Sequence, residues 1–81
     1  MATYNQIIEG LEIIRRCANA AASLEAHRDG KPFSEPRLGG ADHDILWACP
    51  IELITDEEDK ERLRKLGWLA DDASGCWSHY V

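Results

Sequence analysis

Two cysteines and two histidines have the composition of a zinc site, and so they are the first candidates for chemistry in this chain. The four residues are His43, Cys49, Cys76 and His79. Cys76 and His79 are separated by two residues, a gap that zinc knuckles use. In a strand, however, residues three apart point to opposite faces, so these two side chains diverge. We therefore expect no metal and no cofactor, and we expect the cysteines to pack as small apolar side chains. A zinc-binding module remains an alternative.

A histidine beside an aspartate also suggests general-base catalysis. His43 and Asp44 are adjacent, and adjacent residues on a strand face opposite ways, so they cannot form a dyad with each other. The chain also shows no nucleophile motif, no phosphate-binding loop and no metal pair. We therefore expect a protein that is not an enzyme, with no catalytic residue.

An acidic run begins a short helix in the second half of the chain. Thr55 and Glu58 have the spacing of a capping box, and Gly67 follows a basic last turn. Three pairs at spacing i, i+4 would support this helix: Asp56 with Lys60, Glu58 with Arg62, and Glu61 with Lys65. The acidic residues also suggest mimicry of nucleic-acid phosphates, but the interleaved basic residues favour a solvated helix surface.

Large aromatic residues are numerous for so thin a core. We expect Trp47 and Trp68 inside, with Trp77 or Tyr80 partly exposed, because Trp and Tyr dominate binding hot spots. Trp77 and Tyr80, together with nearby carboxylates, form the predicted partner-binding surface. Its residues are Glu57, Glu58, Asp71, Asp72, Trp77 and Tyr80.

The elements that position these residues indicate a single α+β domain over residues 1–81. Thr3 and Gln6 predict a capped helix over 4–28, followed by a Gly- and Pro-rich loop over 29–42. Residues 43–81 read as a β-α-β-β unit, with a central strand at 43–49 and a terminal hairpin. We expect two layers, with one long and one short helix on an antiparallel sheet of about three strands.

The first helix is longer than so small a domain is wide. Its second half is rich in alanine, which favours helix in any context and also permits close packing of two helices. A small structural or regulatory homodimer that associates through this helix is therefore the second hypothesis for function.

Charge and composition limit the partners. The 81 residues carry a net charge of −6, all of it after residue 28, which disfavours direct binding to nucleic acid or to an anionic membrane. No apolar run is long enough to span a bilayer. The odd count of three cysteines and the lack of a signal peptide favour a reducing cytoplasm.

Three stretches of the second half carry a resemblance to known proteins. They are Ala-Asp-His-Asp at 41–44, Thr-Asp-Glu-Glu-Asp-Lys at 55–60 with Leu-Gly-Trp at 66–68, and Cys-Trp-Ser-His-Tyr-Val at 76–81. Residues 42–81 thus resemble small uncharacterised proteins of bacteriophages and prophages. The resemblance implies an inhibitor of the anti-CRISPR or another anti-defence class. Such an inhibitor attaches to a larger host protein or ribonucleoprotein complex, such as a defence effector, and occludes it.

Overall fold

A long N-terminal helix begins and ends where local sequence signals place its boundaries. A computed structural model describes residues 2–42 and 44–80, and in it α1 spans Tyr4–Asp29. The Thr3 hydroxyl accepts a hydrogen bond from the Gln6 amide at 3.1 Å, and the Gln6 side chain accepts one from the Thr3 amide at 2.8 Å. The helix stops at Gly30, whose φ of 67° lies in the left-handed region that glycine favours. The predicted capping box and helix are therefore confirmed.

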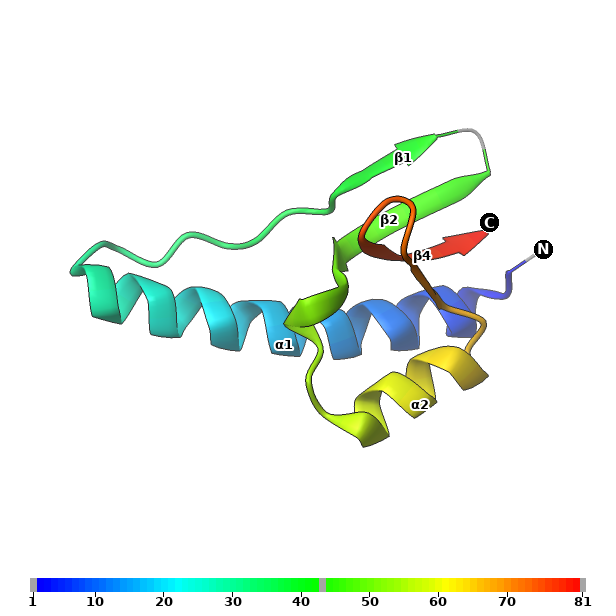
Figure 1. Cartoon of the computed structure of the whole chain (residues 1–81), viewed down its shortest axis with the longest axis horizontal. Helices are drawn as coiled ribbons and strands as arrows, with labels where there is room; N and C mark the ends of the chain where they lie inside the picture. The colour runs from blue at the N-terminus through cyan, green and yellow to red at the C-terminus, as the bar shows by residue number, and fades with distance from the viewer. Residues whose placement is uncertain (1, 43, 81) are drawn as a thin grey trace.

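Four short strands form one antiparallel sheet in the order β1-β2-β4-β3 (Figure 1). They are β1 (Gly40–Asp42), β2 (Ile45–Pro50), β3 (Leu69–Asp71) and β4 (Cys76–Tyr80). The α+β class is confirmed, as are the central position of β2 and the terminal hairpin. The extra strand, β1, lies at the end of the segment predicted as loop, because pairing with β2 extends Gly40–Asp42.

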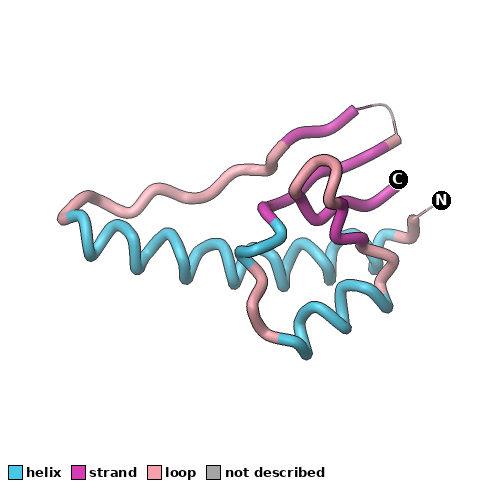
Figure 2. Tube along the Cα trace, in the orientation of Figure 1, coloured by secondary structure: helices cyan, strands magenta, loops and turns pink. Residues whose placement is uncertain are grey.

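A second helix, α2 (Glu57–Lys65), follows a 3-10 turn at Ile51–Leu53 (Figure 2). Its N-cap is Asp56, whose carboxylate accepts a hydrogen bond from the Glu58 amide at 2.8 Å. The predicted Thr55 cap is therefore wrong by one residue. The helix begins at Glu57, so Asp56 occupies the cap position and its carboxylate reaches the Glu58 amide. Asp is a helix cap about as effective as Ser or Thr.

The core lies between one face of the sheet and the two helices. Its largest fully buried side chains are Trp68, Trp77, Ile54 and Leu63. The Trp68 indole packs directly on α1 at Gly10, where any Cβ would lie 2.0 Å from its Nε1 atom. That nitrogen donates a hydrogen bond to the Gln6 carbonyl at 3.0 Å. Trp68 thus joins the sheet to the first half of α1, and its predicted burial is confirmed.

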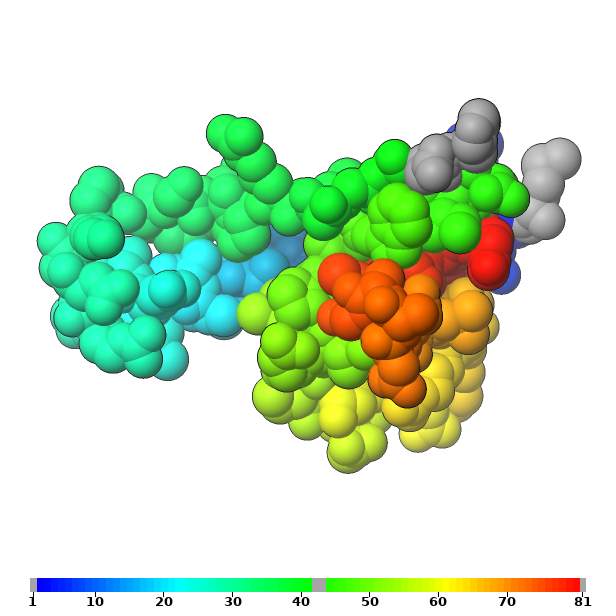
Figure 3. All heavy atoms as spheres, turned by 45° about the horizontal axis from the view of Figure 1, so that its top comes forward, coloured from blue at the N-terminus to red at the C-terminus, as the bar shows by residue number. Residues whose placement is uncertain are grey.

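The second half of α1 extends past the sheet, and the chain returns beside it. We call residues 18–39 the arm: the end of α1 together with the extended segment that leads back to β1 (Figures 1 and 2). The arm gives the molecule its long axis, with extents of 42 × 27 × 24 Å (Figure 3). In the part of the chain that the structure describes, no helix has both the length and the apolar character of a membrane span.

Candidate functional site

The strand register divides the side chains of the sheet between two faces. Leu46 pairs with His79, and Cys49 pairs with Trp77. These four face the helices, where His79 meets Trp68 edge-on at 5.2 Å between ring centroids. Trp47 pairs with Ser78, and Ser78 also pairs with Leu69. Because paired residues share a face and strand neighbours alternate, Trp47, Ser78 and Leu69 point away from the helices.

We call this second side the outer face, and it is mainly apolar. Its central residues are Ile45, Trp47, Leu69, Ser78 and Tyr80, and Pro50, Cys76 and Asp71 continue the same face toward one end. Leu69 and Tyr80 are 53% and 57% exposed, and Ile45 and Trp47 are half-buried. None of these four large side chains packs against the core cluster. The outer face thus presents one Trp, one Tyr and two aliphatic side chains to solvent, and Trp and Tyr are the types that most often anchor protein interfaces.

The charges of the sheet and its two hairpin turns all have one sign. Residues 40–50 and 69–80 contain four aspartates, at positions 42, 44, 71 and 72, and no lysine or arginine. They therefore carry four of the six net negative charges of the chain. Asp44 and Asp72 are exposed at the β1–β2 and β3–β4 turns, and Asp71 accepts a hydrogen bond from the Ala73 amide at 3.0 Å. The charges that the sheet and its turns carry are therefore all negative.

The acidic residues of α2 are balanced by basic ones. Asp59 pairs with Arg16 of α1 at 2.7 Å, and Lys60 pairs with Glu57 at 3.1 Å. Of the three predicted i, i+4 pairs, Glu61 with Lys65 is confirmed at 3.6 Å. The other two are wrong because their members have different partners. Asp56 caps α2, Lys60 binds Glu57, and Arg62 binds Glu9 of α1.

The predicted partner-binding residues lie in three places: on the sheet and its β3–β4 turn, on α2, and in the core. Asp71, Asp72 and Tyr80 lie on the sheet and its β3–β4 turn, next to or on the outer face. Glu57 and Glu58 are exposed, but they lie on α2, in the helical layer.

Trp77 is the clearest correction within that set. Its side chain is fully buried on the helix-facing side of β4, with the Arg64 guanidinium 5.9 Å from the ring centroid. Of the two residues of which one was expected to be partly exposed, Tyr80 is exposed, whereas Trp77 is not, because its place in the register turns it toward α2. Its place among the predicted partner-binding residues is therefore wrong. The companion expectation that Trp47 is inside is also wrong, since this half-buried side chain belongs to the outer face.

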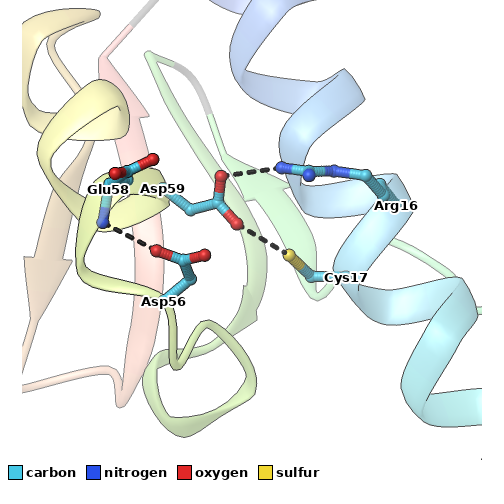
Figure 4. Close-up of polar contacts among 5 residues, drawn as sticks. All are labelled: Arg16, Cys17, Asp56, Glu58 and Asp59. Carbon is cyan, nitrogen blue, oxygen red and sulfur yellow. Dashed lines mark hydrogen bonds and ion pairs between the residues drawn. The ribbon is translucent and has the colours of Figure 1, made fainter.

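Cys17 lies in the polar contact between α1 and α2 shown in Figure 4. Its Sγ lies 3.6 Å from one carboxylate oxygen of Asp59, while Arg16 binds the other oxygen (Figure 4). Burial, and then the negative charge of Asp59, raise the pKa of the Cys17 thiol. A catalytic cysteine needs the opposite shift, because the thiolate is the nucleophile. Cys17 therefore donates its proton to a structural hydrogen bond that joins the two helices.

The remaining cysteines and histidines do not assemble into a ligand set in the described residues. Cys76 and His79 point to opposite faces of β4, as the spacing predicts. Both ring nitrogens of His79 are occupied, with Nε2 2.8 Å from the Leu66 carbonyl and Nδ1 2.6 Å from that of Tyr80. Burial raises the pKa of Cys49 to about 12. His43 lies outside the described residues, and among those described no three Cys, His, Asp or Glu side chains are grouped to hold a metal ion.

A groove of about 720 Å³ runs between the arm's helix and its return segment. Ala18, Ala21 and Ala22 line the helical side, residues 34–39 line the opposite side, and Pro50 and Leu53 lie where β2 ends. The alanine side chains leave this space open because they are too small to reach the returning segment.

The sequence indicates part of the outer face. The alternation of Ile45 and Trp47, and of Ser78 and Tyr80, marks one side of each strand, but only the pairing of β2 with β4 shows that these sides coincide. Leu69 has no such signal, because it is the first residue of a strand of only three residues.

Comparison with known proteins adds no relative. No protein-family model, no curated protein and no solved structure matches this chain.

Proposed function

We propose that this protein is a non-catalytic binding domain that attaches to a larger protein through the outer face of its sheet. The observation that carries the proposal is the combination of exposed aromatic and aliphatic side chains with a sheet whose charged residues are all aspartates. Apolar anchors supply the energy of most interfaces, and charge complementarity selects the partner. The partner we propose therefore has an apolar patch bordered by lysine and arginine.

The resemblance of residues 42–81 to phage and prophage proteins supports a narrower version of the proposal. In that version the partner is a larger bacterial host protein or ribonucleoprotein complex, such as a CRISPR effector, and binding inhibits it by occlusion. The uniform sign of the sheet's charges suits a surface that normally contacts nucleic acid, because such surfaces are basic.

Matched variants test the binding face. Leu69→Ser and Tyr80→Ser remove apolar anchors from the outer face, whereas Tyr4→Ser removes a 90% exposed tyrosine from the start of α1. The immobilised wild-type protein and the three variants are compared for quantitative capture from bacterial lysate, read by mass spectrometry. We expect the same protein to be retained by the wild type and by Tyr4→Ser, and to be lost with both outer-face variants. Retention that does not differ among the four proteins would contradict the proposal.

Charge reversal then separates the sheet from α2. Asp44→Lys with Asp72→Lys changes the charge at the hairpin turns, and Glu57→Lys with Glu58→Lys makes the same change on α2. With the captured partner in surface plasmon resonance, we expect the first pair to slow association, more at low than at high ionic strength. The second pair should have the smaller effect. A larger effect from the α2 pair would place the interface on the helical layer.

A further inference from the structure

His79 is a buried histidine whose two ring nitrogens both lie against carbonyl oxygens. Its side chain is on the helix-facing side of β4, and the residue is 6% exposed. Nε2 lies 2.8 Å from the carbonyl of Leu66, the C-cap of α2, and Nδ1 lies 2.6 Å from the carbonyl of Tyr80, the last residue of β4. Both distances are those of hydrogen bonds. One side chain thus connects the end of α2 to the end of β4.

A neutral imidazole cannot bond to both carbonyls. It has one N–H donor, and its other nitrogen carries a lone pair that only accepts. A carbonyl oxygen also only accepts, so in a neutral ring one of the two contacts would bring two lone pairs together. An imidazolium has an N–H at each nitrogen and can donate to both oxygens. The two contacts of His79 therefore fit the doubly protonated ring.

The surroundings of the ring hold it in this position. Trp68 meets it edge-on at 5.2 Å between ring centroids, and Leu46 pairs with His79 from β2. Gly67 lies so close that a Cβ at this position would be 2.8 Å from Nε2. A ring enclosed in this way has little room to turn from one carbonyl toward another partner.

The backbone also favours a positive charge at this place. Burial alone favours the neutral ring, but hydrogen bonds donated by the charged ring favour the charged form. The carbonyls at a helix C-terminus carry partial negative charge, and the Leu66 carbonyl lies at the C-terminus of α2. Hydrogen bonds with a charged donor are about twice as strong as neutral ones.

The charged side chains on the surrounding elements have other partners. β2 and β4 contain no Asp, Glu, Lys or Arg, and their other titratable side chains are those of Cys49, Cys76 and Tyr80. On the helices, Glu9 pairs with Arg62, and Lys65 pairs with Glu61. Within residues 2–42 and 44–80, no ion pair involves His79. The two carbonyls are thus the partners that decide whether the ring holds its second proton.

We propose that His79 is a proton-dependent clasp, in which the doubly protonated ring joins the end of α2 to the end of β4, and loss of one proton as the pH rises releases one of the two bonds. The folded protein then binds this proton more readily than the unfolded chain does. The stability that the clasp contributes is complete below about pH 6.5, where a free histidine is also charged, and declines as the pH rises further. The clasp holds the backbone of Tyr80, a residue of the outer face, but it does not depend on the binding role of that face.

Nitrogen NMR of the wild-type protein gives the first test. In an imidazolium both ring nitrogens are protonated and resonate close together, whereas in a neutral ring they are far apart. His27 is exposed in the last turn of α1 and serves as the internal reference. We expect the nitrogens of His79 to keep the imidazolium pattern to a higher pH than those of His27. Loss of the second proton from His79 at the same pH as from His27, or at a lower one, overturns the proposal.

Matched variants give the second test. His79→Gln keeps a donor for one carbonyl but carries no charge, and His27→Gln makes the same exchange at the exposed histidine. Urea midpoints are measured between about pH 5 and 8, the range in which histidine titrates. We expect the advantage of the wild type over His79→Gln to shrink as the pH rises, and the curve of His27→Gln to stay parallel to that of the wild type. An advantage over His79→Gln that is constant or grows with pH overturns the proposal. The NMR test needs only the wild-type protein, so it decides the question even where His79→Gln does not fold.

Discussion

The sheet with its two hairpin turns and the arm are of nearly equal length, 23 and 22 residues, but they expose different surfaces. The sheet covers a dense core on one side and exposes aromatic and aliphatic side chains on the other, with charges of one sign only. The arm has no core, small side chains and equal numbers of basic and acidic residues. A surface with one sign of charge repels a copy of itself and favours a partner of opposite charge, whereas a surface with balanced charges does neither. The distribution of charge thus separates two apolar surfaces that exposure alone would rank together.

The largest loss of stability is expected from a change in the core beneath the sheet. Trp68→Ala removes a fully buried indole and its hydrogen bond to Gln6, so the free energy of unfolding should fall by about 3–5 kcal/mol. Urea denaturation followed by circular dichroism measures this loss. A decrease below about 1 kcal/mol would show that the sheet does not depend on this contact with α1.

A pH-dependent effect is expected at Cys49, on the helix-facing side of β2. Burial raises the pKa of its thiol from 9.0 to about 12 in the folded protein, so the unfolded chain loses this proton first as pH rises. The stability that depends on the protonated thiol is complete below about pH 9 and is lost as the pH rises toward 12. Cys49→Ala should flatten this decline relative to the wild type. Parallel stability curves for the two proteins across that range would contradict the prediction.

The start of α2 should show a moderate effect that distinguishes two adjacent residues. Asp56→Ala removes the observed cap and should cost about 1 kcal/mol of stability. Thr55→Ala should change stability by less than about 0.5 kcal/mol, because Thr55 is exposed and does not cap the helix. Thermal melts of the two variants provide the comparison. A larger loss of stability from Thr55→Ala than from Asp56→Ala would show instead that Thr55 caps the helix.

The smallest effect is expected in the arm. Leu24 is 68% exposed on α1 and lies outside the residues that line the groove. Leu24→Ala should therefore change the free energy of unfolding by no more than about 0.5 kcal/mol. Chemical denaturation at two protein concentrations checks this value. A loss of several times that size would mean that something covers this face of the arm.

The features predicted correctly from the sequence are those that depend on local interactions. Thr3, Gln6 and Gly30 specify the ends of α1 through contacts within a few residues, and Glu61 lies one helical turn from Lys65. The class of the fold follows from these elements and from the alternation within the strands.

Most of the errors come from contacts between residues far apart in the sequence; the Thr55 cap and the Asp56–Lys60 pair fail instead because Asp56 and Glu57 make competing local contacts. Arg62 binds Glu9, 53 residues away, and not its predicted partner Glu58.

Trp47 lies on the outer face and Trp77 on the helix-facing side, because Trp47 pairs with Ser78 and Trp77 pairs with Cys49. Alternation within one strand does not say which of its two sides the helices cover. β1 was not predicted because glycine is typical of loops. Gly40 is part of a strand here because it pairs with Trp47 of β2.

The two edge strands, β1 and β3, contain three residues each. Fibrils grow when the unpaired backbone of one edge adds a further chain, and the segments that build them are about six or seven residues long. Each edge here offers about half that length, and the strand or turn beside it carries aspartates that repel a like edge. The protein can therefore keep an apolar sheet face in water without adding copies edge to edge. Lateral growth at the edges is thus disfavoured, while the outer face of the sheet stays exposed.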